Sequence, residues 1–120
     1  MKTDRADYIR GLRNLAGILE QNDDLPLPWE GTGSSISLHF LHAIDPVSSM
    51  IAAMGAIPCG FTSRIATYVS GSAYLDLDGE LHGVKIKLTA FRKDTCKQVD
   101  GEWHIPDAIT SRAPEAEATA

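Results

Sequence analysis

The alternation of apolar and polar residues between positions 61 and 91 constrains the fold more than any other feature of the chain. Side chains of the two kinds alternate over residues 61–69, and the alternation returns in residues 73–77 and 81–91. A period of two residues is typical of half-buried β-strands. The short connections between these segments predict consecutive antiparallel strands. The predicted inward residues of the last segment are Val84, Ile86, Leu88 and Ala90, and the predicted outward residues are Lys85, Lys87 and Thr89.

Three dipeptides mark the predicted turns. Gly71-Ser72 separates the first two strands. Asp78-Gly79 predicts the next hairpin, because a two-residue type I′ turn needs positive φ at both central positions. Asp100-Gly101 predicts a last, small hairpin near the end of the chain.

Two helices are predicted ahead of these strands, one on each side of a strand over residues 35–41. The first covers residues 4–20, with Thr3 or Asp4 as its cap. The second covers residues 46–54, because Asp45-Pro46 joins an N-cap residue to a proline at the first helical position. The apolar stripe of the first helix consists of Tyr8, Ile9, Leu12, Leu15, Ala16 and Leu19.

The predicted fold class is α+β: an N-terminal helix, then β-α-β-β-β with a mainly antiparallel sheet covered on one face by two helices, and a small C-terminal hairpin. A chain of 120 residues fits one domain. We therefore expect a single domain over residues 1–110. Residues 113–120 are mostly small or acidic with no large apolar side chain, and we expect a disordered acidic tail over residues 111–120.

The charge balance limits the classes of partner. A net charge of −5 argues against a general nucleic-acid binder, which is usually basic. Lysines and arginines nevertheless gather in the second half of the chain, and Tyr68, Tyr74 or Phe91 could add stacking surfaces. This outer face is either a solvated surface or a binding face, with a protein or self-association as the favoured partner and nucleic acid as the alternative. The candidate partner-binding residues are Arg64, Lys85, Lys87, Arg92, Lys93 and Lys97.

No spacing in the chain predicts a metal or cofactor site, and we expect no catalytic residue, no metal, no cofactor and no obligatory small molecule. One enzymatic alternative stays open, in which Cys59 is a nucleophile beside His39 or His42. The charged start of the chain does not resemble a secretory signal peptide, so we expect a cytoplasmic location with reduced cysteines. No apolar stretch is long enough to predict a membrane span.

Several segments resemble small uncharacterised proteins of actinobacteria and their bacteriophages. The Gly-Leu-Arg-x-Leu-Ala pattern over residues 11–16 is followed by a proline connector at residues 25–28, as in those proteins. Residues 92–99 are similar to their Arg-x-x-Val-Cys-x-x-Val segment. Residues 100–106 depart from the Thr-Gly-Thr-type turn that those proteins carry there.

This resemblance implies an accessory protein of phage or prophage origin, and it implies no reaction. Together with the residues, it leads to one expectation of function. We expect a non-enzymatic accessory protein that binds a host or phage macromolecule, with a nucleic-acid-binding regulator and a small Cys/His enzyme as alternatives.

Overall fold

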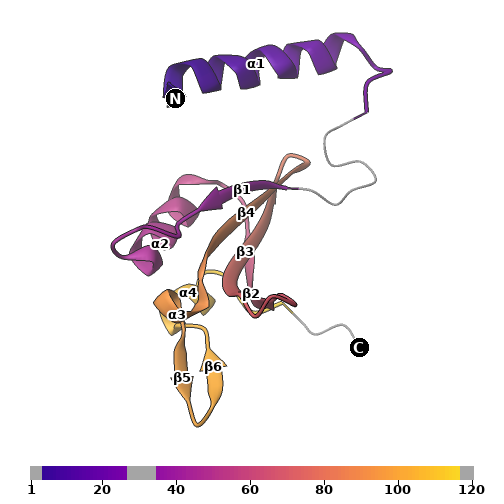
Figure 1. Cartoon of the computed structure of the whole chain (residues 1–120). Helices are drawn as coiled ribbons and strands as arrows, with labels where there is room; N and C mark the ends of the chain where they lie inside the picture. Colours follow the sequence, from indigo (N-terminus) through magenta and orange to yellow (C-terminus); the bar gives the residue numbers. More distant parts are fainter. Residues whose placement is uncertain (1–3, 27–34, 117–120) are drawn as a thin grey trace. The chain divides into compact units, whose positions relative to one another are not determined.

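The computed structural model describes residues 4–26 and 35–116 (Figure 1). The chain divides into two compact units, Met1–Ser34 and Ser35–Ala120, and each is described by itself. The expectation of one domain over residues 1–110 differs from this division. The helix of the first unit is α1 (Arg5–Gln21), and none of its residues is buried.

Local polar contacts define both ends of α1. Asp4 Oδ1 accepts a hydrogen bond from the Ala6 amide at 3.2 Å, and this cap satisfies one of the unpaired donors of the first turn. At the other end, Asn22 Nδ2 donates to the Ile18 carbonyl at 2.8 Å. The helix predicted over residues 4–20 is confirmed to within one residue at each end.

The second unit holds every strand of the described chain. Four strands form one mixed sheet in the order β1-β4-β3-β2, where β1 pairs parallel to β4 and the other two pairings are antiparallel. The α+β class and the mainly antiparallel sheet are therefore as predicted. The elements of this unit are β1 (Ile36–His39), α2 (Pro46–Ala56), β2 (Phe61–Thr67), β3 (Ala73–Leu81), β4 (Val84–Phe91), α3 (Arg92–Thr95), β5 (Lys97–Val99), β6 (Glu102–His104) and α4 (Asp107–Thr110).

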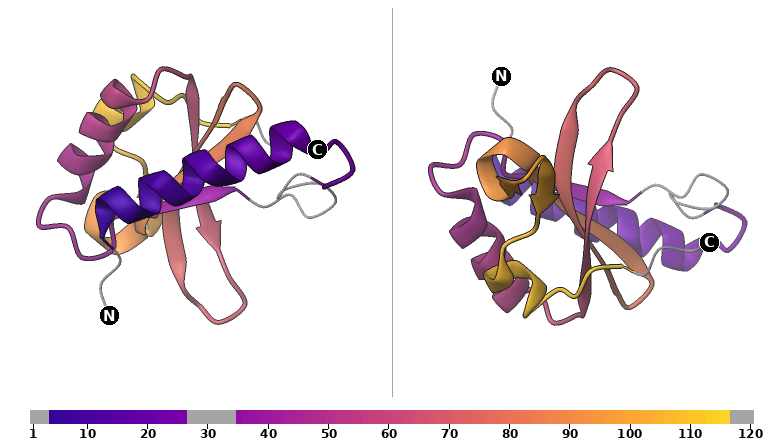
Figure 2. Two further views of the ribbon diagram at one scale, coloured as in Figure 1. Left: turned by 90° about the horizontal axis from the view of Figure 1, so that it is seen from above. Right: turned by 90° about the horizontal axis from the view of Figure 1, so that it is seen from below.

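The core of this unit lies on one face of the sheet. Met50 of α2 and Ile109 of α4 pack with the inward residues of the strands, and Figure 2 shows α2 and the yellow α4 on the same side of the sheet. Asp45 begins α2 as predicted, with Oδ1 accepting from the Ser48 amide at 3.2 Å. The sequence did not predict α4, whose four residues are too few to show a periodic pattern. The buried apolar residues are Met50, Phe61, Leu75, Leu77, Leu88, Ala90, Cys96, Ile105, Ile109 and Ala113.

The predicted turn at Asp78-Gly79 is wrong. The strand β3 continues through both residues to Leu81, and the turn lies at His82-Gly83, where φ is 49° and 86°. Both angles are positive, as a type I′ turn requires. A Cβ atom on Gly79 would lie 2.8 Å from Phe61 Cε1 and 2.9 Å from the Gly60 carbonyl oxygen. Gly79 therefore permits a close approach within the sheet and does not form a turn.

The C-terminal part contains one predicted feature and one departure. The hairpin of β5 and β6 turns at Asp100 and Gly101, as predicted. Residues 111–116, however, pack on the sheet unit instead of starting a tail. Ala113 is fully buried, the Ser63 amide donates to the Pro114 carbonyl at 2.9 Å, and the Ala116 amide donates to the Ser63 carbonyl at 2.9 Å. The rest of the predicted tail, residues 117–120, lies outside the described residues.

Candidate binding site on the outer face of the sheet

The sheet has a second face, turned away from the core, which we call the polar face. The register brings polar and aromatic residues of all four strands together there, because residues directly opposite one another share a face. Arg64 lies opposite Asp76, Asp76 opposite Thr89, and His39 opposite Thr89. The polar face comprises Thr62, Arg64 and Ala66 of β2, Tyr74, Asp76, Asp78 and Glu80 of β3, Lys85, Lys87, Thr89 and Phe91 of β4, and Ser37 and His39 of β1.

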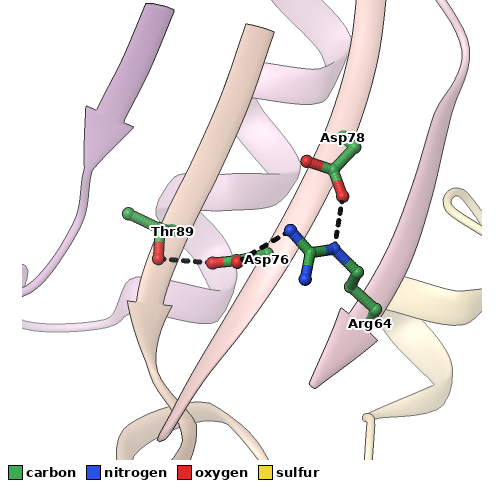
Figure 3. Close-up of polar contacts among 4 residues, drawn as sticks. All are labelled: Arg64, Asp76, Asp78 and Thr89. Carbon is green, nitrogen blue, oxygen red and sulfur yellow. Dashed lines mark hydrogen bonds and ion pairs between the residues drawn. The ribbon is translucent and has the colours of Figure 1, made fainter. Parts of the chain in front are cut away.

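A buried carboxylate lies at the centre of this face (Figure 3). Asp76 is only 1% exposed, and its Oδ1 accepts a hydrogen bond from Thr89 Oγ1 at 2.6 Å. Its Oδ2 lies 3.4 Å from Arg64 Nη2, yet accepts no hydrogen bond within the described residues. The Arg64 contact is therefore a charge contact without donor geometry. A buried carboxylate is costly unless a charge or hydrogen bond compensates it, and here Arg64 and Thr89 do so.

Arg64 links this centre to Asp78. Arg64 Nε donates a hydrogen bond to Asp78 Oδ2 at 2.8 Å. This hydrogen bond is the main cause of a raised pKa of Arg64, and the charges of Asp78 and Asp76 add to it. Figure 3 shows the guanidinium between the two carboxylates. Arg64 is thus engaged within the protein and offers little free charge to a partner.

The six predicted partner-binding residues come from several elements of the second unit. Arg64, Lys85 and Lys87 lie on the polar face, as the alternation predicted. Arg92 and Lys93 belong to α3, and Lys97 belongs to β5 in the separate two-stranded sheet. The register places Glu80 opposite Lys85 and Asp78 opposite Lys87. Along the middle of the strands, acidic residues therefore balance the basic ones.

Three aromatic rings form a row at one end of the polar face. Tyr68 meets Tyr74 edge-on with 5.6 Å between ring centroids, and Tyr74 stacks on Phe91 at 5.4 Å with 24° between planes. Lys93 Nζ lies 5.5 Å from the Phe91 centroid, whereas the Arg92 guanidinium lies 4.3 Å from the Trp103 centroid. We call Tyr68, Tyr74 and Phe91 the aromatic row. The sequence had named these three as stacking candidates, and the structure brings them together.

The surface beside the aromatic row is hollowed. A hollow of about 410 Å³ lies among β1, β3, β4 and the β2–β3 turn, with His39, Tyr68, Tyr74, Asp76 and Lys87 among its walls. A neighbouring hollow of about 250 Å³ is lined by Phe91, Arg92 and Lys93, and Ser72 belongs to both. Pockets of a few hundred Å³ with a few convergent polar groups are the usual shape of a ligand site.

The structure places Cys59 and one of its two candidate histidines, His39, in different hollows. His39 lines the hollow of the polar face, whereas Cys59 lines a different one with Met54, Phe61 and Arg112. The other thiol, Cys96, is buried, and burial raises its pKa, which makes it a poor nucleophile. Within residues 4–26 and 35–116, no group of three His, Cys, Asp or Glu side chains is placed to hold a metal ion.

The polar network around Asp76 was missed from the sequence. With a turn predicted at Asp78-Gly79, neither Asp78 nor Glu80 is expected within a strand. The pairing of these two acids with Lys87 and Lys85 was therefore not predicted. One signal could have found the correct pairing. Leu75 and Leu77 begin a two-residue spacing of apolar residues that reaches Leu81. A strand that extends to Leu81 puts the turn at His82-Gly83.

A second candidate surface belongs to the first unit. Four large apolar side chains of the predicted stripe, Tyr8, Ile9, Leu12 and Leu15, are 41–57% exposed, whereas Leu19 is half-buried. We call Tyr8, Ile9, Leu12, Leu15, Ala16 and Leu19 the α1 stripe.

None of the helices that the structure describes has the length and apolar character needed to cross a membrane. Comparisons of the chain with protein families, with curated proteins and with solved structures find no match.

Proposed function

We propose that the protein is an accessory binding protein, without catalysis of its own, that docks onto another protein through the α1 stripe. The observation that carries this proposal is the exposure of the stripe: Tyr8 is 57% exposed and Leu12 and Leu15 are each 44% exposed. A helix of 17 residues buries none of its residues, yet amphipathic helices gain most of their stability by burying their apolar face. Such a helix needs a surface to cover it.

The geometry of α1 favours an apolar groove as that surface. Tyr8, Leu12, Leu15 and Leu19 recur at steps of four, three and four residues along a helix of about 25 Å. This is the pattern by which amphipathic helices anchor themselves in a groove of a partner. Burial of each large apolar side chain contributes roughly 1.5–3 kcal/mol, so a few anchors suffice for a stable complex.

The resemblance to actinobacterial and phage proteins supports the setting of the proposal. It suggests a partner that is a protein of the phage or of its host. A cytoplasmic place of action and an origin in a phage or prophage belong to this proposal.

The two alternatives have less support. A regulator that holds a long nucleic-acid backbone along the whole sheet would have to pass the acids of β3, which lie opposite the lysines of β4. A Cys/His enzyme needs its groups within hydrogen-bond reach, and Cys59 and His39 line different hollows.

Capture from an actinobacterial lysate tests the proposal with a matched pair of variants. Leu12→Ser/Leu15→Ser removes two anchors of the stripe, whereas Asn14→Ser/Gln21→Ser places two serines on the other side of the same helix. We expect a stoichiometric protein that survives nuclease treatment, is lost with the first variant and is retained with the second. Equal capture by all three forms would contradict a role for the stripe.

The oligomeric state identifies the occupant. Sedimentation of the purified wild-type protein is expected to show a monomer. If the wild type is a dimer and the Leu12→Ser/Leu15→Ser variant is a monomer, the stripe binds a second copy of the chain and not a different protein.

A further inference from the structure

The aromatic row makes one end of the polar face chemically different from the rest. Tyr74 and Phe91 are partly exposed and Tyr68 is 50% exposed, so ring surface remains open beside both hollows. A cross-strand aromatic pair alone would account for the contact between Tyr74 and Phe91. It does not account for the two adjoining hollows or for the charges that line them.

The charges at this end favour an anion. Lys87 lines the larger hollow and Lys93 the smaller one, and neither forms any of the ion pairs found within residues 4–26 and 35–116. Asp78 lies opposite Lys87 but is bound to Arg64. Among the described residues, Asp76 is the one carboxylate that lines either hollow; Thr89 donates to its Oδ1, and Arg64 lies 3.4 Å from its Oδ2. No described carboxylate holds either ammonium group in an ion pair, and Lys93 Nζ lies against the Phe91 ring.

We propose that this end of the polar face binds a nucleotide unit, with its base stacked on the aromatic row and its phosphate against Lys87. Every base has a π-face, so stacking on tyrosine requires no particular base. Hydroxyl groups of Ser37, Ser70 and Ser72 line the same hollow and can meet sugar and phosphate oxygens. The volume of about 410 Å³ lies in the range of small-ligand sites.

The second hollow extends the inference. Phe91 and Lys93 repeat the combination of a ring and a cation next to the first hollow. A single-stranded step of two nucleotides therefore fits the pair of hollows, whereas a duplex, whose bases are already stacked on one another, does not. This site belongs to the sheet unit alone and does not depend on the proposed role of α1.

Titration of the full chain with AMP, UMP and single-stranded hexanucleotides tests the inference, with NMR shifts of the Ser72 and Lys87 amides as the readout. Adenosine supplies a base without phosphate, and ribose 5-phosphate supplies phosphate without a base. We expect AMP to bind at least about tenfold more tightly than either fragment, since stacking and charge act together. Tighter binding of hexanucleotide than of AMP would identify a strand as the source of the nucleotide unit, and equal binding would identify the free nucleotide.

Matched variants locate the site. Lys87→Gln and Tyr68→Ala are each expected to weaken AMP binding about tenfold. Lys85→Gln lies on the same face of the same strand but outside both hollows, and it should leave binding unchanged. Tyr74→Phe keeps the ring and should bind as the wild type does. Unchanged unfolding temperatures of Lys87→Gln and Tyr68→Ala would show that the loss is not a loss of fold.

Three results would overturn the inference. The first is the absence of binding to any nucleotide or hexanucleotide at millimolar concentration. The second is equal weakening by Lys85→Gln and Lys87→Gln. The third is tighter binding of free phosphotyrosine than of AMP, which would assign the hollow to a phosphorylated peptide.

Discussion

Gly79 shows at the scale of one residue how closely the strands approach. Its neighbours on one side are the Phe61 ring and a backbone carbonyl of Gly60, and the carbonyl cannot move without shifting β2. We expect Gly79→Ala to lower the free energy of unfolding by about 1–3 kcal/mol, the usual effect of overpacking. Chemical denaturation of the two proteins measures this difference.

Gly55→Ala is the matched control for that substitution. Gly55 lies in α2 with open space around its Cα, and alanine has the higher helix propensity. The control is therefore expected to be neutral or stabilising. A Gly79→Ala protein as stable as the control would show that the close approach does not exist.

The two cysteines should differ in reactivity. Burial raises the pKa of Cys96, so less of it is thiolate at a given pH, and Cys59 is the more accessible of the two. We expect iodoacetamide at pH 8 to alkylate Cys59 first, as measured by peptide mass spectrometry over time. Faster labelling of Cys96 would place that thiol outside the core.

The β3–β4 turn gives a prediction at the scale of elements. His82 has φ of 49°, a conformation that asparagine adopts more readily than histidine. We expect His82→Asn to raise the unfolding temperature slightly and Gly83→Ala, at φ of 86°, to lower it. Opposite signs for the two variants in a thermal melt would support the turn at these positions, and a neutral Gly83→Ala would not.

Ser63 joins the C-terminal segment to β2. Its Oγ is buried and donates to the Ala113 carbonyl at 2.7 Å, across a separation of 50 residues. We expect Ser63→Ala to cost about 1 kcal/mol of stability, because the buried carbonyl loses its partner. Denaturant titration measures the cost, and an unchanged midpoint would mean that residues 113–116 do not pack as described.

The elements that the sequence predicted correctly are those with local causes. Asp45 caps α2 through a hydrogen bond from Ser48, three residues away, and the alternation of β4 follows from its own side chains. The turn was misplaced because an Asp-Gly dipeptide is typical of a hairpin turn. The real reason for a glycine at position 79 is the close approach of Phe61, which is distant in the sequence and cannot be seen from the dipeptide. The burial of Asp76 and the order of residues 113–116 depend on such distant partners as well. The candidate basic residues could be named, but the acids that lie opposite Lys85 and Lys87 depended on the register.

At the scale of the whole molecule, the chain divides into two compact units. The second unit has its own core and a polar face with a hollowed aromatic end. The first unit presents a helix whose apolar stripe is exposed. Our proposal assigns the α1 stripe to a partner and not to the protein's own core.

The unfolding temperature of the purified Leu12→Ser/Leu15→Ser variant tests this claim most directly, because no partner needs to be known. Calorimetry is done at a concentration where sedimentation shows a monomer, and the shift in unfolding temperature is converted to a difference in the free energy of unfolding. We expect this free energy to match that of the wild type to within about 0.5 kcal/mol, as is usual for exposed substitutions. A loss of about 4 kcal/mol or more, the cost of emptying two core positions, would show that the protein already buries the stripe itself.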